Sequence, residues 1–185
     1  MTGRSEEVFF ETVEAPGFEP VCLAWKETGS VFRAVRVFLP SPGVSAMERL
    51  LGCFQGAVKE SCAESDEFVQ KIGLFLGGSD VVFPREQCDM SLGPDYRKSV
   101  LMALNEVPRG SVTTYGRLAE RTGGCARSVG NALSANPFPL IVPCHRVVRA
   151  NGEAGEYQGG FEMKRILLAN EGVGFDRRGR CNDTV

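Results

Sequence analysis

Residues 114–134, TYGRLAERTGGCARSVGNALS, have the pattern of two short helices separated by a pair of glycines. Thr113 or Thr114 can cap the first helix, because a hydroxyl at this position accepts backbone N–H groups of the first turn. The glycine pair at 123–124 ends that helix, since glycine readily adopts the left-handed conformation that follows many helices. The second helix is expected at about 125–134. Two short helices joined by a tight glycine turn predict a helix-turn-helix.

The second of these helices has two different faces. One face is apolar and should point inward; it consists of Val129, Ala132 and Leu133. The other face has almost no side chains and consists of Ala126, Gly130 and Ser134, with Arg127 beside it. A stripped face can lie against a DNA minor groove about 6 Å wide. The same small residues can instead allow close packing against another helix, and the spacing leaves both interpretations open.

The first third of the chain is expected to form strands. Three runs of β-branched and aromatic residues bounded by Pro or Gly predict them, at 8–16, 20–29 and 31–40. The polar stretch 26–30 is expected to be a hairpin turn. Helical spacing then begins at Ser45, and a second helix is expected to end at Gly77-Gly78.

The segment 81–95 contains Pro and Gly without periodicity, so we place a domain boundary between Cys88 and Pro94. After it, apolar residues space a helix from Tyr96 to Leu104. The fold class is therefore expected to be α+β. We expect three parts, namely a small α+β domain at 1–90, a mostly helical domain with the helix-turn-helix at 91–175, and a tail at 176–185.

The charge is distributed unevenly along the 185 residues. The whole chain carries −2, yet residues 108–149 hold six arginines, Glu120 as the single acid and no lysine, which gives this segment +5. The remaining residues therefore carry −7. A basic segment on an acidic chain is typical of a protein that meets nucleic-acid phosphates on one face.

The cysteines and the amino terminus indicate the compartment. Seven cysteines form no CxxC pair, and an odd number favours free thiols under reducing conditions. The amino terminus becomes acidic before any apolar run, and no run approaches the ~20 apolar residues of a membrane helix. We therefore expect an intracellular protein without membrane contact, located in the cytoplasm and nucleoid or in a nucleus.

Cys144 stands directly before His145, the only histidine of the chain. Three interpretations compete for this cysteine: a buried structural thiol, a metal ligand and a nucleophile. No ligand spacing supports a metal site. Pro143 favours an extended backbone before it, in which neighbouring side chains point to opposite faces. His145 would then reach Cys144 only through a bend or a bridging water, which argues against a cysteine hydrolase.

A thiolate that attacks a saturated carbon requires only one base. The product is a thioether, which has no carbonyl for water to attack, so the thiol is not regenerated. If the electrophile is a saturated carbon, this cysteine and histidine would carry out a group transfer that consumes the protein in one turnover.

The surrounding motifs carry a family resemblance from about Tyr96 to Val173. The stretch around Cys144 resembles the active-site signature of the O6-alkylguanine-DNA alkyltransferases, also called methylated-DNA–protein-cysteine methyltransferases. The matching stretches are NPFPLIVPCHRVV at 136–148, VPRGSVTTYGRLA at 107–119, ARSVGNA at 126–132, GEYQGGF at 155–161, Lys164 and NEG at 170–172.

The resemblance implies direct reversal of DNA damage. An alkyl group would move irreversibly from O6 of guanine, or from O4 of thymine, to Cys144, without a cofactor and without a metal. Glu171 would hold His145, which would deprotonate Cys144 through a water molecule. Asn136 would form hydrogen bonds within the turn that presents Cys144. The amino-terminal domain would be ribonuclease-H-like.

The resemblance also implies how DNA is bound. The partner would be double-stranded DNA, and the protein would be a monomer. Arg127 would fill the gap of the flipped nucleotide, while Ala126, Gly130 and Ser134 would face the minor groove. Tyr115 would crowd the adjacent phosphate and contact the base. The remaining pocket residues would be Val147, Tyr157, Gln158, Gly159 and Gly160.

Two other functions remain as alternatives. A non-catalytic lesion-binding relative would lack the acceptor cysteine, so Cys144 argues against it. A helix-turn-helix regulator would require polar base-reading side chains on the second helix, where Ala126, Gly130 and Ser134 offer little.

Overall fold

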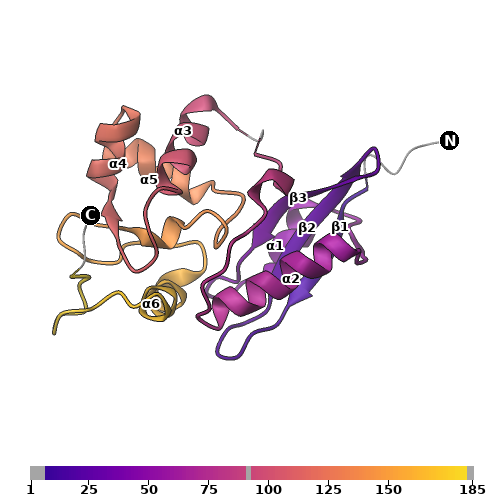
Figure 1. Cartoon of the computed structure of the whole chain (residues 1–185), viewed down its shortest axis with the longest axis horizontal. Coiled ribbons are helices and arrows are strands. Elements are labelled where there is room, and N and C mark those ends of the chain that lie inside the picture. The colour runs from indigo at the N-terminus through magenta and orange to yellow at the C-terminus, as the bar shows by residue number, and fades with distance from the viewer. Residues whose placement is uncertain (1–6, 91–92, 183–185) are drawn as a thin grey trace. The chain divides into compact units, whose positions relative to one another are not determined.

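A computed structural model describes residues 7–90 and 93–182 (Figure 1). The chain divides into two compact units, Met1–Met90 and Ser91–Val185. The first unit combines a sheet with helices and the second is mostly helical, which confirms the α+β class. Within the described ranges, no helix is both long and apolar enough to span a bilayer.

The first unit is built on a four-stranded sheet in the order β3-β2-β1-β4. Its strands are β1 Phe9–Val13, β2 Val21–Thr28, β3 Val31–Phe38 and β4 Val58–Lys59. β2 pairs antiparallel with both β1 and β3, whereas β4 runs parallel to β1. The three long strands confirm the prediction, but the hairpin turn is shorter than the predicted 26–30, because β2 stays paired with β3 as far as Thr28. β4 was not predicted, because two residues are too few to show an alternating pattern.

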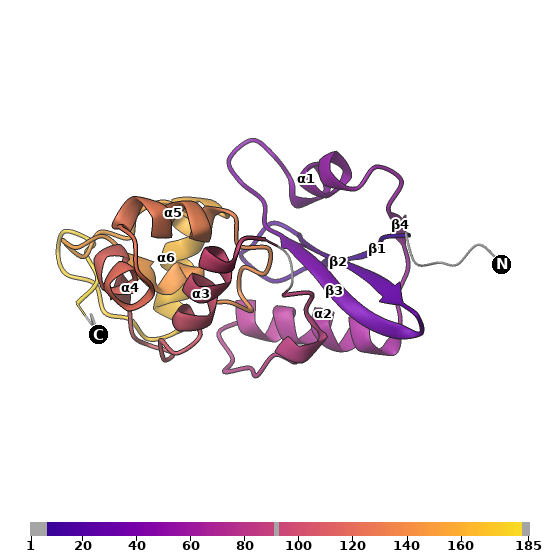
Figure 2. The same ribbon diagram turned by 90° about the horizontal axis from the view of Figure 1, so that it is seen from above.

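Two helices cover opposite faces of this sheet, α1 Ala46–Cys53 and α2 Ala63–Leu76 (Figure 2). Ser45 and Glu48 form a capping box at the start of α1, where each side chain accepts the other's backbone N–H. Both helices were predicted. The connection after α2 contains a 3₁₀ turn, η2 Arg85–Gln87.

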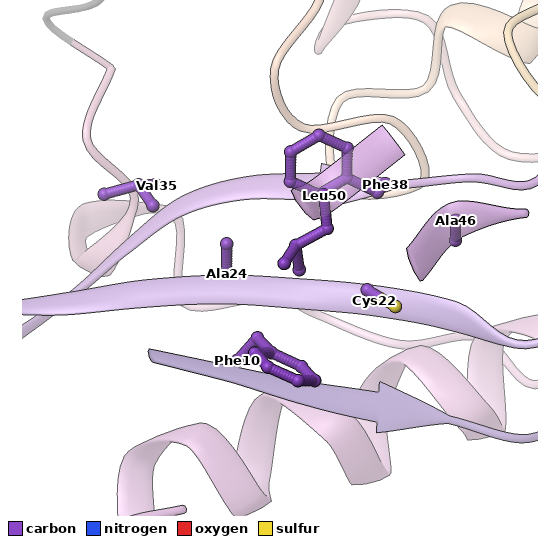
Figure 3. Packing of buried hydrophobic residues seen from close by; sticks show 7 residues of the cluster. All are labelled: Phe10, Cys22, Ala24, Val35, Phe38, Ala46 and Leu50. Atoms are coloured by element: carbon purple, nitrogen blue, oxygen red, sulfur yellow. The ribbon is translucent and has the colours of Figure 1, made fainter. Parts of the chain in front are cut away.

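The sheet buries apolar side chains on both faces because successive residues of a strand point to opposite sides. The α1 side is shown in Figure 3 and consists of Phe10, Cys22, Ala24, Val35, Phe38, Ala46 and Leu50. An aromatic row connects the sheet to α2: Phe9 contacts Trp25, Trp25 contacts Phe32 and Phe32 contacts Phe68, with ring centroids 4.6, 5.5 and 5.4 Å apart.

The second unit contains three helices that pack against one another, α3 Asp95–Leu104, α4 Tyr115–Thr122 and α5 Ala126–Ser134. The buried side chains among them are Val100, Leu101, Leu104, Leu118, Ala119, Val129, Ala132 and Leu133. The predicted inward stripe of α5 is therefore confirmed. Its stripped face points away from this core, and Ala126 and Ser134 are exposed.

The turn between α4 and α5 is tightly specified. Thr114 caps α4 by accepting the backbone N–H of Arg117 at 3.2 Å, as predicted. Gly124 has φ of +97°, and a Cβ there would lie 2.7 Å from both Ser128 Oγ and Tyr96 Oη. Those two oxygens hydrogen-bond each other at 2.8 Å, which connects α5 to α3. Only glycine fits this position.

The rest of the second unit brings Cys144 close to α4. β5 Thr113–Thr114 pairs parallel with β6 Val147–Val148, and between α5 and β6 lies a 3₁₀ turn, η3 Cys144–Arg146. The chain therefore bends at Cys144, which is one of the two arrangements that the sequence left open. The last helix is α6 Gly160–Asn170.

Candidate active site

Asn136 organises the turn that presents Cys144. Its side-chain nitrogen donates to the carbonyl of Val142 and to Cys144 Sγ, both at 3.2 Å, and its oxygen accepts the N–H of Phe138 at 3.0 Å. The side chain is fully buried, so these bonds are shielded from water. Leu140 within the same turn has φ of +75°, a strained conformation for a side-chain-bearing residue. The turn is therefore held by Asn136 in a shape that the free chain would avoid.

His145 is oriented by Glu171. The Nε2 atom of the buried imidazole lies 3.0 Å from Glu171 Oε1. Because a carboxylate can only accept, Nε2 carries the proton and Nδ1 is the basic nitrogen of the neutral ring. The ring of Tyr157 lies edge-on to the imidazole, with centroids 6.3 Å apart.

Arg146 holds the other side of the Glu171 carboxylate. Its Nε donates to Oε2 at 2.8 Å and its Nη2 donates to Oε1 at 2.7 Å, a bidentate ion pair. Its Nη1 donates to the carbonyl of Val107 at 2.7 Å. Burial alone would raise the pKa of Glu171, but the hydrogen bonds and charges of His145 and Arg146 lower it to about 2. Glu171 is therefore a fixed anion at neutral pH.

Burial sets the resting state of the cysteine and the histidine. It raises the pKa of the Cys144 thiol, against the opposing effects of the Asn136 hydrogen bond and the Lys164 charge. It lowers the pKa of His145, against the opposing effect of Glu171. The pair at neutral pH is thus a thiol beside a neutral imidazole, which is the protonation state a general base requires.

Lys164 is fully buried in α6 and connects two segments of the site. Its ammonium donates to the carbonyl of Val147 at 2.7 Å and to the carbonyls of Ala154 and Glu156. Burial lowers its pKa to about 8, partly offset by the nearby Cys144 and Cys181. Lys164 thereby joins the segment after Cys144 to the loop that carries Tyr157.

A cavity of about 960 Å³ is lined in part by Cys144, and we call it the Cys144 cavity. Its walls come from α5, from the start of α4 and from the segments 149–150 and 156–158; the lining residues are Tyr115, Ala126, Arg127, Gly130, Asn131, Leu133, Ser134, Cys144, Arg149, Ala150, Glu156, Tyr157 and Gln158. The structure thus brings Cys144 to the same hollow as the predicted face of α5.

Three predicted pocket residues do not line this cavity. Val147 is fully buried, and its carbonyl accepts from Lys164. Gly159 precedes α6, and Gly160 has φ of +81° and lines a neighbouring cavity. His145, Asn136 and Glu171 lie behind Cys144 rather than in the wall, as supports of the sulfur.

Gln158 lines the cavity, but its amide is engaged with the protein. Its Nε2 donates to the carbonyl of Asn136 at 3.0 Å and to the carbonyl of Leu133 at 3.3 Å. The side chain therefore attaches the Tyr157 loop to the end of α5, and it would have to leave these carbonyls to reach a ligand.

Sequence reasoning assigned no role to Arg146 or Lys164. Both stand inside the quoted motifs, and the signal that could have found Lys164 is a lone lysine on the apolar side of α6. Five further wall residues were also missed: Asn131, Leu133, Arg149, Ala150 and Glu156. Among the residues with described positions, no cluster of three or more His, Cys, Asp or Glu side chains could hold a metal ion.

Comparison with known proteins identifies the family. The sequence profile of the 6-O-methylguanine DNA methyltransferase DNA-binding domain matches residues 95–173. A methylated-DNA–protein-cysteine methyltransferase of Methanothermobacter thermautotrophicus is 44% identical over 60% of this chain and 62% of its own length, which is less than two thirds of that relative. The same-named protein of Saccharolobus islandicus is 39% identical over 65% of this chain and 78% of its own length.

A solved structure agrees with the sequence relatives. The Mycobacterium tuberculosis OGT in complex with DNA superposes with a TM-score of 0.67 at 29% identity, covering 88% of this chain and 92% of that protein. The similarity therefore includes both compact units. With its cysteine, buried histidine and cavity in place, the chain belongs to the methylated-DNA–protein-cysteine methyltransferase family.

Proposed function

We propose that this protein repairs DNA by moving a methyl or other alkyl group from O6 of guanine to the sulfur of Cys144. The observation that carries the proposal is the position of Cys144: this residue lines a cavity, and the next residue is a histidine whose imidazole is held by Glu171. The relatives' names describe the same transfer to a protein cysteine.

The reaction needs one proton relay and one displacement. The Cys144 proton passes through a water molecule to Nδ1 of His145, while Glu171 stabilises the resulting imidazolium. The thiolate attacks the alkyl carbon, so an S–C bond forms as the C–O6 bond breaks and its electron pair stays on O6. The guanine then takes up one proton. The thioether has no route back to a thiol, so each molecule reacts once and no cofactor is needed.

The guanine must leave the base stack before its O6 substituent can reach Cys144. In this proposal α4 and α5 act as a helix-turn-helix. The small side chains Ala126, Gly130 and Ser134 let α5 approach the minor groove, and Arg127 occupies the space of the extruded nucleotide. Tyr115 contacts the base and crowds the adjacent phosphate.

The main-chain carbonyls of Cys144 and Val147 are proposed to read the guanine, together with the loop 157–160. Lys164 would hold the Val147 carbonyl in position for this contact. The first unit is proposed to be ribonuclease-H-like. The protein is proposed to act as a monomer inside the cell, in the compartment that contains its DNA.

Replacing the acceptor tests the proposal. Cys144→Ala should bind a duplex containing O6-methylguanine yet take up no methyl group, whereas Cys53→Ala should react like the unchanged protein. Cys53 is the control because it is an exposed cysteine at the end of α1, outside the proposed DNA-binding helices. Methyl transfer to Cys144→Ala at the unchanged rate would refute the proposal.

A further inference from the structure

The segment after Val173, beyond the match to the family profile, forms an ordered turn; we define residues 174–182 as the carboxy-terminal turn. Asp176 organises it: one carboxylate oxygen accepts the backbone N–H groups of Arg178 and Arg180 at 2.8 and 2.9 Å. The other oxygen pairs with the Arg180 guanidinium at 2.7 Å. The backbone closes the turn through Asp176 N–H to the Arg180 carbonyl and Asn182 N–H to the Gly174 carbonyl.

The carboxy-terminal turn is attached to the second unit. The Cys181 N–H donates to the carbonyl of Gly152 at 2.8 Å, and Cys181 packs in a cluster with Val112, Val148, Leu168 and Val173. Phe175 packs against the same cluster and lies under the Arg165 guanidinium, 5.8 Å from its ring centroid. The backbone of the turn is therefore attached to the second unit at Phe175 and Cys181.

This attachment places the turn beside the Cys144 cavity. Arg149 and Ala150, just before the anchoring Gly152, belong to the wall of that cavity. A second hollow of about 540 Å³ shares Arg149, Glu156 and Tyr157 with it and is bounded by Arg178 and Gly179. No residue of α5 lines the second hollow. The turn thus continues the rim on the side that α5 does not form.

Some arginines in and near the carboxy-terminal turn form ion pairs, and others do not. Arg180 is matched by Asp176, and Arg149 by Glu153 at 3.0 Å. Arg177 and Arg178 are both exposed, and neither forms an ion pair with any residue whose position is described. Among the residues that line both hollows, Glu156 is the remaining exposed acid. Arg177 and Arg178 are therefore exposed on a backbone that hydrogen bonds hold in place.

We propose that the carboxy-terminal turn is a second DNA-backbone contact, in which Arg177 and Arg178 bind phosphates flanking the lesion. The proposal rests on the proposed function, which places DNA over the Cys144 cavity. With α5 in the minor groove, both flanking backbones pass the cavity rim, because that groove is only about 6 Å wide. α5 forms one side of the rim, and the carboxy-terminal turn continues the other side. Guanidinium groups suit phosphates because they donate two parallel hydrogen bonds.

The salt dependence of binding to an undamaged duplex tests this contact. The slope of log K against log salt is negative, and each lost phosphate contact makes it less steep by about 0.9. The double variant Arg177→Ala/Arg178→Ala should therefore have a slope that is less steep by about 1.8. Arg177→Lys/Arg178→Lys should keep most of the steepness of the unchanged protein. The control Lys71→Ala/Arg85→Ala removes the same charge from the first unit and should leave the slope within a few tenths of the unchanged protein.

A slope for the double alanine variant equal to that of the control would overturn the proposal. So would an equal loss in the lysine variant, because the phosphate contact depends on charge. Reaction of each variant with free O6-benzylguanine is measured in parallel and should stay unchanged, since a free base needs no backbone contact. If the unchanged protein transfers nothing to Cys144, the proposed function fails, whatever the slopes are.

Discussion

Glu171 is the residue on which the other parts of the site depend. Its carboxylate accepts a bidentate pair from Arg146 and orients His145, and both partners come from η3, directly after Cys144. Removing one member of a buried, hydrogen-bonded charge network costs more than the network contributes, because the remaining charge is left without a partner. Glu171 therefore affects both stability and chemistry.

Glu171→Gln should lower both properties. The variant loses the anion that Arg146 needs, so the free energy of unfolding should fall by about 3 kcal/mol. It also loses the orientation of His145, so alkylation should slow by roughly 10²-fold. Urea unfolding and single-turnover rates with free O6-benzylguanine measure the two effects. Glu162→Gln, at an exposed and loose 3.9 Å pair of α6, is the control and should change stability by less than about 0.5 kcal/mol.

Acid should remove the contribution of Glu171 selectively. The folded protein lowers the pKa of this carboxyl from its ordinary value of 4.5 to about 2. The resulting stabilisation is fully present above pH 4.5, and it is lost as the pH falls from 4.5 toward 2. A pKa lowered by this much corresponds to about 3 kcal/mol of stability. Urea unfolding at pH 6 and pH 3 should show the gap between wild type and Glu171→Gln narrowing, and parallel curves would contradict this.

At the scale of the elements, the α4–α5 turn depends on Gly124. Gly124→Ala puts a Cβ 2.7 Å from Ser128 Oγ and Tyr96 Oη at φ of +97°. We expect a loss of about 2 kcal/mol or more from strain and from the disrupted Tyr96–Ser128 bond. Gly116→Ala, inside α4 with its nearest contact at 3.8 Å, should instead stabilise by up to about 1 kcal/mol. Thermal unfolding distinguishes the two variants.

α5 should matter for duplex DNA and little for a free base. Extruding a nucleotide costs a few kcal/mol, so Arg127→Ala should slow repair of O6-methylguanine duplex by roughly 10- to 100-fold. Reaction with free O6-benzylguanine should be nearly unchanged. Arg121→Ala on α4, whose charge pairs with Glu106, is the matched control and should affect neither rate strongly. Equal decreases in the rates with both substrates would contradict the proposal that Arg127 helps to extrude the nucleotide.

The elements differed in how well the sequence predicts them. α4 and α5 were predictable because Thr114, the glycine pair and the apolar stripe are local signals. The residues alone left a bend at Cys144 as one of two options, and only the family resemblance assigned Asn136 to this turn, because its contact with Cys144 spans eight residues. Lys164 was recognised only as part of a motif, since its three carbonyl partners meet only in the folded chain. The expected roles of the site residues remain predictions.

At the scale of the whole molecule, the two units differ in what their sequences reveal. Runs of β-branched and aromatic residues bounded by Pro or Gly predicted the strands of the first unit, but nothing there indicates a chemistry. The second unit carries both the chemistry and the basic segment 108–149. Its carboxy-terminal turn looked like a tail because Asp176 and Gly152 stabilise it through contacts that no periodicity encodes.

The central claim is that Cys144 accepts the alkyl group. The direct test is to incubate the protein with a duplex containing O6-methylguanine, digest it and locate the added methyl by peptide mass spectrometry. We predict one methyl per molecule, on the peptide with Cys144, with the other six cysteines unmodified. A methyl found on another residue, or an unmodified Cys144 beside repaired DNA, would contradict the account.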